Sequence, residues 1–409
     1  MNTAIHRFKV VLTLLWLLFF NSAAYAQQKY NIYIDADFSG ASQSSQAIKQ
    51  GINTALAEVN YELQGIKFSL VFKDHRANSL RSKRNLQAFL KDEQGIMVFS
   101  GLHSPPLLAN KNFINENRIL LLDPWAAAGP ITRSDSDENW IFRLSIDDSN
   151  AGSFISRKSI EQGFKKPYLL LEDTGWGRSN KKTMGQALKS AAINSVGFSW
   201  FNWGVGSNHA KALLRDIKNS GADVIFFVGN ANEGVTFTKA MVELPEELRL
   251  PIRSHWGITG GDFTQRVPSK LRAQIDLQFI QTNFSFLSGY QSELAANALK
   301  FAIQSNPELT KKHDIKASTG FVHAYDLTKL VISAINQVKL SGNRAQDSVL
   351  IHHALEHLAM PVKGLLKEYH RPFSPYNQQT VNAHEALTME DYAMGKYGDN
   401  NEVILLSDR

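Results

Sequence analysis

The chain is 409 residues long and contains no cysteine, so no disulfide contributes to its stability. Its 44 basic and 38 acidic side chains leave a net charge of +6 at pH 7, spread without long runs. This argues against a nucleic-acid-binding surface, which would need a concentrated basic patch. The length suits two domains of about 150–200 residues, each large enough to build its own apolar core.

The N-terminal segment predicts a secretory signal peptide covering residues 1–26. Arg7 and Lys9 precede a run of 11 residues, almost all apolar, at 10–20, and the small-x-small pattern Ala-Tyr-Ala follows at 24–26. These features are typical of a peptide cut after Ala26. A membrane anchor would need about 20 apolar residues, and a lipid anchor would need a cysteine. We therefore expect an exported chain, and the absence of cysteine favours the periplasm.

Short apolar runs alternate with helical patterns in the first part of the remaining chain. The patterns predict strands at 30–38, 66–74, 95–101 and 118–124, and helices at 44–60, 79–92 and 105–117. The strand at 95–101 is mostly apolar, as expected when both faces of a parallel sheet are covered.

The same alternation repeats further along the chain. Strands are expected at 167–173, 196–204, 222–229 and 251–257, and helices at 154–164, 179–193, 209–221 and 232–244. Three further helical patterns follow, at 290–306, 320–340 and 347–359.

Strands that alternate with helices indicate βαβ units and parallel sheets. Because two such sets are present, we predict an α/β fold of two doubly wound parallel-sheet lobes, joined by three crossovers. We assign 27–143 and 282–360 to lobe 1, and 144–281 and 361–409 to lobe 2. At the first crossing, Asp148 and Ser149 are the expected N-cap residues.

Several segments, in chain order, together resemble one family. They are FSGASQSSQAIKQGINTALAEVN, GLHSPPLLANKNFINENRILLLDPWAAAGPIT, WIFRLSIDDSNAG, LLLEDTGWGRS, ADVIFFVGNANEG and GFVHAYD. Each is similar to a motif of the type I periplasmic binding proteins, in the branch of the branched-chain amino acid receptors. The resemblance implies two lobes with a ligand cleft between them. The lobes would close over the ligand by hinge motion and present it to an ABC transporter or a sensor.

Loops at the carboxyl ends of the predicted strands form the expected binding site, because ligands of open parallel sheets bind there. These loops and the start of the first helix supply the residues expected to contact ligand: Ser45, His103, Ser104, Trp125, Ala126, Ala127, Trp176, Asn230, Trp256 and Asp262. Ser104, before Pro105, is also an expected helix N-cap. The family resemblance implies that the Ser104 hydroxyl donates a hydrogen bond to a ligand carboxylate.

Three positions depart from the family pattern. Ala127 replaces a threonine, Trp176 replaces a tyrosine and Trp125 replaces a small residue. Backbone amides near Ala127 would still bind a carboxylate, but an aromatic, cyclic or quaternary-amine ligand is as consistent with the sequence as an aliphatic amino acid. Asp262 and Glu233 are the acids best placed to meet an ammonium group, and either is equally explained as a helix cap or a solvated acid.

Catalytic and metal chemistry receive little support. His103 and Ser104 are adjacent, so on extended backbone their side chains point apart, and the segment lacks the G-x-S-x-G pattern of hydrolases. His353 and His357 have helical i,i+4 spacing but no evident third ligand, which favours an ordinary helix surface. The glycine-rich segments at 204–208 and 257–262 lack the lysine of a phosphate-binding loop. We expect no metal and no cofactor.

The sequence thus predicts a monomeric, non-enzymatic, periplasmic solute-binding protein. Its expected partners are a small organic ligand, such as an amino acid or a related molecule, and an inner-membrane ABC permease, with no nucleic acid. One alternative keeps the fold but presents the ligand to the sensor domain of a kinase, chemoreceptor or cyclase. An exported hydrolase is the other alternative.

Overall fold

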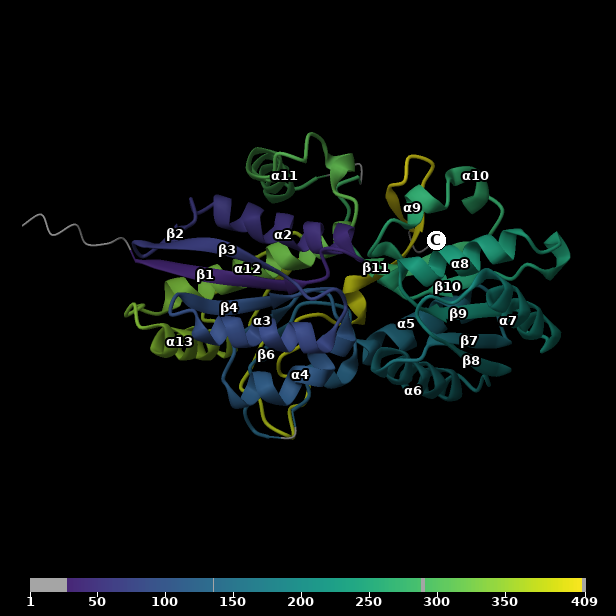
Figure 1. The fold of residues 1–409 in the computed structure, drawn as a ribbon, viewed down its shortest axis with the longest axis horizontal. Coiled ribbons are helices and arrows are strands. Elements are labelled where there is room, and N and C mark those ends of the chain that lie inside the picture. The colour runs from purple at the N-terminus through teal and green to yellow at the C-terminus, as the bar shows by residue number, and fades with distance from the viewer. Residues whose placement is uncertain (1–27, 135, 288–290, 407–409) are drawn as a thin grey trace, which may run out of the picture.

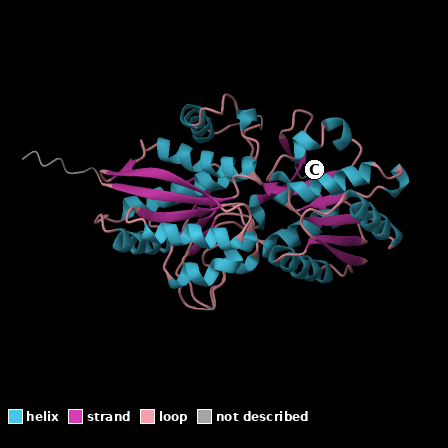
Figure 2. Cartoon of the chain, viewed as in Figure 1, coloured by secondary structure: helices cyan, strands magenta, loops and turns pink. Residues whose placement is uncertain are grey.

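A computed structural model describes residues 28–134, 136–287 and 291–406. The predicted signal peptide lies outside these residues. Within them, no helix is both long enough and apolar enough to cross a membrane. Two sheets lie side by side, each covered by helices on both faces (Figure 1, Figure 2). The predicted α/β fold of two lobes is therefore confirmed.

The sheet of lobe 1 has the strand order β2-β3-β1-β4-β5-β6. Its strands are β1 (Lys29–Ala36), β2 (Glu62–Leu63), β3 (Ile66–Asp74), β4 (Gly95–Ser100), β5 (Leu121–Asp123) and β6 (Ile141–Arg143). All neighbours pair in parallel except the short β2, which is antiparallel to β3. Every residue of β4 is buried, as its apolar pattern predicts.

The helices of lobe 1 come from both ends of the chain. They are α2 (Ser42–Ala57), α3 (Ser79–Lys91), α4 (Ser104–Glu116), α11 (Glu293–Ser305), α12 (Ser318–Gln337) and α13 (Arg344–Glu356). Helices α2 and α12 pack closely, since a Cβ added to Gly51 would lie 2.3 Å from the carbonyl oxygen of Phe321. A larger residue than glycine would force these two helices apart.

The sheet of lobe 2 has the order β15-β14-β11-β10-β9-β7-β8. Its strands are β7 (Pro167–Glu172), β8 (Gly197–Phe201), β9 (Val224–Val228), β10 (Ile252–Ser254), β11 (Leu277–Thr282), β14 (Tyr392–Tyr397) and β15 (Val403–Leu406). The last two are antiparallel to their neighbours. Its helices are α5 (Asp148–Glu161), α6 (Gly175–Ser190), α7 (Ser207–Asn219), α8 (Ala231–Val242), α9 (Phe263–Arg266) and α10 (Ser269–Arg272).

The chain passes between the two lobes three times, as predicted: after β6, after β11 and before β14. The residue boundaries predicted for the lobes remain a prediction, but one contact pattern differs from them. The tail from 361 was assigned wholly to lobe 2, whereas its hairpin of β12 (Val362–Lys363) and β13 (Glu368–Tyr369) packs on α12 of lobe 1.

Hydrogen bonds to one buried carboxylate explain where the hairpin packs. Asp326 of α12 accepts hydrogen bonds from the backbone amides of Leu365 and Leu366 and from the hydroxyl of Tyr369, at 2.6, 3.1 and 2.8 Å. A buried carboxylate needs such donors. Only from Tyr392 onward does the tail join the sheet of lobe 2.

The starts of α4, α5 and α6 differ from the predictions. His103, rather than Ser104, occupies the N-cap position of α4, and no side chain caps that end. Likewise Asp147, rather than Asp148 or Ser149, precedes α5. Helix α6 begins four residues before its predicted start, because Thr174 caps it by accepting a hydrogen bond from the amide of Gly177. Trp176 therefore lies in a helical turn and not in a loop.

Candidate functional site

The carboxyl ends of both sheets meet between the lobes and enclose a cavity of about 430 Å³. We call this the outer cavity. Lobe 1 contributes Asp37, which follows β1, and His103, which precedes α4. Lobe 2 contributes Trp203, Asn230 and Glu233, along with Asp262 and Arg266 at the rim.

The wall on lobe 1 is a hydrogen-bonded carboxylate. Oδ2 of Asp37 lies 3.1 Å from Nε2 of His103, and Oδ1 accepts hydrogen bonds from the amides of Ser39 and Gly40 at 3.1 and 2.7 Å. Burial alone would raise the pKa of Asp37, but the hydrogen bonds from His103 and Gly40 outweigh it and hold that pKa at about 2. Asp37 is therefore a fixed negative charge at neutral pH.

The wall on lobe 2 is organised by Glu172 at the end of β7. Its carboxylate accepts hydrogen bonds from Trp203 Nε1 and Asn230 Nδ2, at 3.1 and 3.0 Å, and from the hydroxyl of Thr174 at 2.7 Å. Burial raises the pKa of Glu172 to about 7. Beside it, Glu233 is only 5% exposed and accepts a hydrogen bond from the amide of Gly204 at 3.0 Å.

A second space lies deeper between the lobes, and side chains almost fill it. This inner cleft is lined in part by Ser104, Trp125, Ala127, Trp176 and Trp256, and its volume is about 10 Å³. The rings of Trp125 and Trp256 are 5.3 Å apart, and each side chain is 1% exposed. The hydroxyl of Ser104 accepts a hydrogen bond from the amide of Ala128 at 3.2 Å.

The lobes touch across the cleft, so the structure represents a closed arrangement. The amide of Ser44 in lobe 1 donates to the carbonyl of Gly260 in lobe 2 at 3.1 Å. A Cβ added to Gly260 would lie 1.9 Å from Cδ1 of Leu102. The rings of His103 and Trp203, one from each lobe, are 5.6 Å apart.

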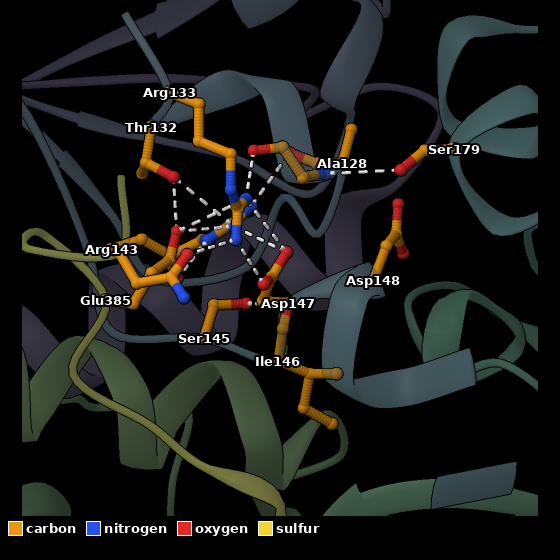
Figure 3. A network of polar contacts seen from close by, with 12 residues as sticks. Ala128, Thr132, Arg133, Arg143, Ser145, Ile146, Asp147, Asp148, Ser179 and Glu385 are labelled. Carbon is orange, nitrogen blue, oxygen red and sulfur yellow. Dashed lines mark hydrogen bonds and ion pairs between the residues drawn. The ribbon is translucent and has the colours of Figure 1, made fainter. Parts of the chain in front are cut away.

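A buried ionic network holds the loop that carries Trp125 (Figure 3). Arg143 donates to the carbonyls of Ala126 and Ala128 at 3.1 and 2.9 Å, binds both oxygens of Glu385 at 2.8 and 2.6 Å, and contacts Asp147 at 2.9 Å. Glu385 comes from the tail and Asp147 from the first crossing between lobes. The network thus joins the inner cleft to two of the connecting segments.

The structure divides the residues predicted to contact ligand. His103, Asn230 and Asp262 line the outer cavity, while Ser104, Trp125, Ala127, Trp176 and Trp256 line the inner cleft, which His103 and Asn230 also reach.

Two predicted residues have internal roles. Ser45 is fully buried, and its hydroxyl donates to the carbonyl of Asp37 at 2.8 Å. Ala126 is also fully buried, with its amide bound to Asp123 at 2.8 Å. Neither side chain lines the cavities described above.

Sequence reasoning missed Asp37, Glu172 and Trp203. Asp37 and Glu172 stand at the ends of strands that were themselves predicted, so position at the carboxyl end was the available signal. Trp203 follows β8 in the same way. The sequence offers no sign that Glu172 would bind Trp203, since 31 residues separate them.

A family model described as "Periplasmic binding protein" matches residues 34–244. Among curated proteins, a Leu/Ile/Val-binding protein homolog of Brucella melitensis is 26% identical over 222 residues, 53% of this chain and 58% of that protein. An uncharacterized protein of Methanocaldococcus jannaschii is 25% identical over 170 residues, 40% of each chain. The matches thus span about half the length of these curated relatives.

Solved structures share the fold at low identity. A type 1 periplasmic binding protein of Bordetella pertussis superposes with a TM-score of 0.76 at 14% identity, covering 93% of this chain and 100% of that one. A solute-binding protein of R. palustris in complex with 4-hydroxybenzoate has a TM-score of 0.74 at 17% identity, covering 93% and 96%. The isoleucine-bound branched-chain amino acid transporter protein LivJ of Streptococcus pneumoniae reaches 0.73 at 20%, covering 92% and 98%.

Proposed function

This chain belongs to the periplasmic binding protein family, and on that basis we propose that it captures a small organic ligand in the outer cavity by closure of the two lobes. The observation that carries the proposal is the cavity of about 430 Å³ between the strand ends of both lobes. Pockets of roughly 300–1,000 Å³ are typical for small molecules. The proposed role is binding without catalysis.

We further propose that the ligand carries an amine or quaternary ammonium group. The outer cavity is lined by Asp37, Glu233 and Asp262, against Arg266 and His103. Asp37 is already hydrogen-bonded to His103 at 3.1 Å, and Arg266 lies 3.5 Å from Asp262. Glu233 makes no such contact with either of these side chains, so it is the acid proposed to meet the ligand cation. Trp203 offers an aromatic face nearby, and cations bind such faces. The neighbours bound to isoleucine and 4-hydroxybenzoate support a ligand about as large as these two molecules.

The ligand is proposed to lie in the outer cavity rather than the inner cleft. In the inner cleft, Trp125 and Trp256 occupy the space and Ser104 is already hydrogen-bonded to Ala128. The Ser104 hydroxyl accepts from Ala128 and keeps its own hydrogen to donate, so hydrogen bonding does not exclude a ligand carboxylate here. The limit is volume, because the tryptophans leave only about 10 Å³ in the inner cleft. This is the physical reason to separate this chain from relatives that bind aliphatic amino acids.

A thermal-shift screen tests the proposal. The chain starting at Gln27 is melted with betaines, amines, branched-chain amino acids and benzoates. A ligand at 100 times its Kd should stabilise the folded state by about 2.7 kcal/mol. Glu233→Gln should weaken binding of a cationic ligand at least tenfold, whereas Glu246→Gln, an exposed acid on the same lobe, should not.

The outcomes separate the two parts of the proposal. If no compound raises the melting temperature, capture of these small molecules is wrong. If a compound binds the wild type and Glu233→Gln equally, capture stands and the recognition of a cation by Glu233 is wrong.

Delivery to an ABC permease is proposed as the physiological step, with presentation to a sensor domain as the alternative. Both begin with the same closure. If the chain delivers its ligand to an ABC permease, cells that lack the chain should take up less radiolabelled ligand. Unchanged uptake together with a lost behavioural or signalling response would favour the sensor.

A further inference from the structure

Two histidines and a glutamate gather on lobe 1, away from both cavities. His352 and Glu356 stand one turn apart on α13, and His384 comes from the tail before β14. Helix α13 lies at the end of lobe 1 far from lobe 2 (Figure 1). We call these three residues the His352 cluster. It is not the pair expected from the sequence, since His353 and His357 stack on each other with ring centroids 4.1 Å apart.

The distances within the His352 cluster suit one metal ion. One nitrogen or oxygen atom from each residue lies within 4.8 Å of the other two. Nε2 of His384 is 3.1 Å from Oε1 of Glu356, and Nδ1 of His352 is 3.8 Å from Oε2. Zinc binds such atoms at about 2.0–2.2 Å, so ligand atoms around one ion are roughly 3–4 Å apart. Small side-chain rotations would bring all three to this spacing.

The other nitrogen of each ring is held by a backbone carbonyl. Nε2 of His352 lies 2.9 Å from the carbonyl oxygen of Asn139, and Nδ1 of His384 lies 3.0 Å from that of Ile141. A carbonyl only accepts, so these nitrogens carry the hydrogen. The remaining nitrogen of each ring faces Glu356 and would supply its lone pair to a bound ion. Metal-binding histidines are oriented in this same way in proteins.

The surroundings are mostly apolar, with limited access to solvent. The ring of His384 stacks on Phe142 at 3.9 Å between centroids, and that of His352 lies 4.3 Å from Trp140. The side chain of His384 is fully buried, while those of His352 and Glu356 are 14% and 11% exposed. An ion could therefore enter from one side, where solvent would supply the remaining ligand.

We propose that the His352 cluster is a binding site for a divalent transition metal ion of the zinc class, with His352 Nδ1, His384 Nε2 and the Glu356 carboxylate as its ligands. Imidazole with carboxylate suits zinc and its neighbours better than calcium or magnesium, which prefer oxygen alone. The proposal does not depend on the function proposed above.

The bound ion would fasten the tail to lobe 1. Glu356 already accepts a hydrogen bond from the amide of Tyr376 at 3.2 Å, so tail and helix are in contact. The residue after His384 is Glu385, which binds Arg143 in the network beside the inner cleft. An ion at His384 would therefore hold Glu385 in place beside the connecting segments.

The test uses chain without an affinity tag, stripped of metal with a chelator. Zn²⁺ is titrated against a chromophoric chelator, and Co²⁺ is added separately to record its visible absorption. The wild type should bind one Zn²⁺ per chain, and Zn²⁺ should raise its melting temperature. Bound Co²⁺ should show the visible absorption bands typical of an ion with a low coordination number. His352→Gln and Glu356→Gln should each weaken Zn²⁺ binding at least about tenfold, the loss typical even for residues that only orient a ligand.

His353→Gln is the matched control, because it removes a neighbouring histidine of the same helix. It should bind Zn²⁺ like the wild type. Circular dichroism and melting without metal establish that each variant is folded, and His352, being partly exposed, is the safer substitution. The proposal is overturned if folded wild type binds no Zn²⁺, if both cluster variants bind it unchanged, or if His353→Gln abolishes binding.

Discussion

The outer cavity and the inner cleft lie between the same two sheets, yet one is open and the other is filled. Charged and polar groups surround the outer cavity, including Asp37, His103 and Glu233. Tryptophans dominate the inner cleft, which has about 10 Å³ of free volume against about 430 Å³. The comparison teaches that loops at the carboxyl ends of strands supply both a place for a ligand and the packing that closes the lobes.

Trp125→Ala tests whether the inner cleft is packing. Removing this fully enclosed ring should lower the free energy of unfolding by about 3–5 kcal/mol, the usual cost of emptying a core aromatic site. Trp203→Ala in the outer cavity is the control, because Trp203 is 41% exposed and should cost about 1 kcal/mol or less. Urea unfolding measures both. If both variants lost the same free energy of unfolding, the inner cleft would not be packed more tightly than the outer cavity.

Arg143→Met tests the network that holds the same loop. The variant leaves the carboxylates of Asp147 and Glu385 buried without their main cation. Breaking a buried ion pair on one side typically costs about 3–5 kcal/mol. Arg118→Met, which removes an exposed pair with Glu138, should cost under about 1 kcal/mol. Urea midpoints that fall equally in both variants would contradict a structural role for the network.

Gly320→Ala tests the packing of Trp125 by adding an atom beside the ring instead of removing the ring. A Cβ at Gly320 would lie 2.3 Å from Cζ3 of Trp125. Overpacking of this kind should destabilise the chain by about 1–3 kcal/mol, even though alanine favours the helix. Combining it with Trp125→Ala should relieve part of the loss in thermal melts. Additive losses would mean that the two residues do not press on each other.

Asp123→Asn probes the same loop through pH. Burial raises the pKa of Asp123 to about 7, above the roughly 3.9 of an unfolded aspartate. Between about pH 4 and 7 the folded chain therefore holds a proton that the unfolded chain has lost, so this residue makes stability fall as pH rises.

The Asp123→Asn variant should lack the fall in stability that Asp123 causes between about pH 4 and pH 7. Its urea midpoint, compared with that of the wild type, should improve steadily from pH 4 to pH 7 and then level off. Oδ1 of Asp123 accepts hydrogen bonds from Ser100, Trp125 and Ala126, and an asparagine oxygen can keep these. Parallel profiles for the two proteins would show that Asp123 is ionised in the folded state at these pH values.

Particular residues show how far sequence reasoning reached at the site. The position of His103, Asn230 and Asp262 after strands was enough to predict that they border a cleft, and they line the outer cavity. Trp125 was placed in a cleft loop by the same rule, but whether a tryptophan faces ligand or packing depends on its neighbours. Its neighbours Trp256 and Gly320 come from distant parts of the chain.

The His352 cluster shows the same limit. The helical spacing of His353 and His357 is visible in the sequence, and it marks a stacked pair rather than the metal site proposed here. His384 joins His352 and Glu356 only because the tail returns to lobe 1. No periodicity in the tail predicts this return, because His384 is held by contacts with the Ile141 carbonyl and Glu356, which are distant in the chain.

By itself, the sequence determined the alternation of strands and helices, and with it two parallel sheets whose loops gather at one edge. Local hydrophobic periodicity decides these features, because each strand or helix must bury its own apolar face. The tertiary structure alone decided which loop residues close on each other and which leave a cavity. Those choices depend on the shapes and charges of side chains that meet across the two lobes, far apart along the chain.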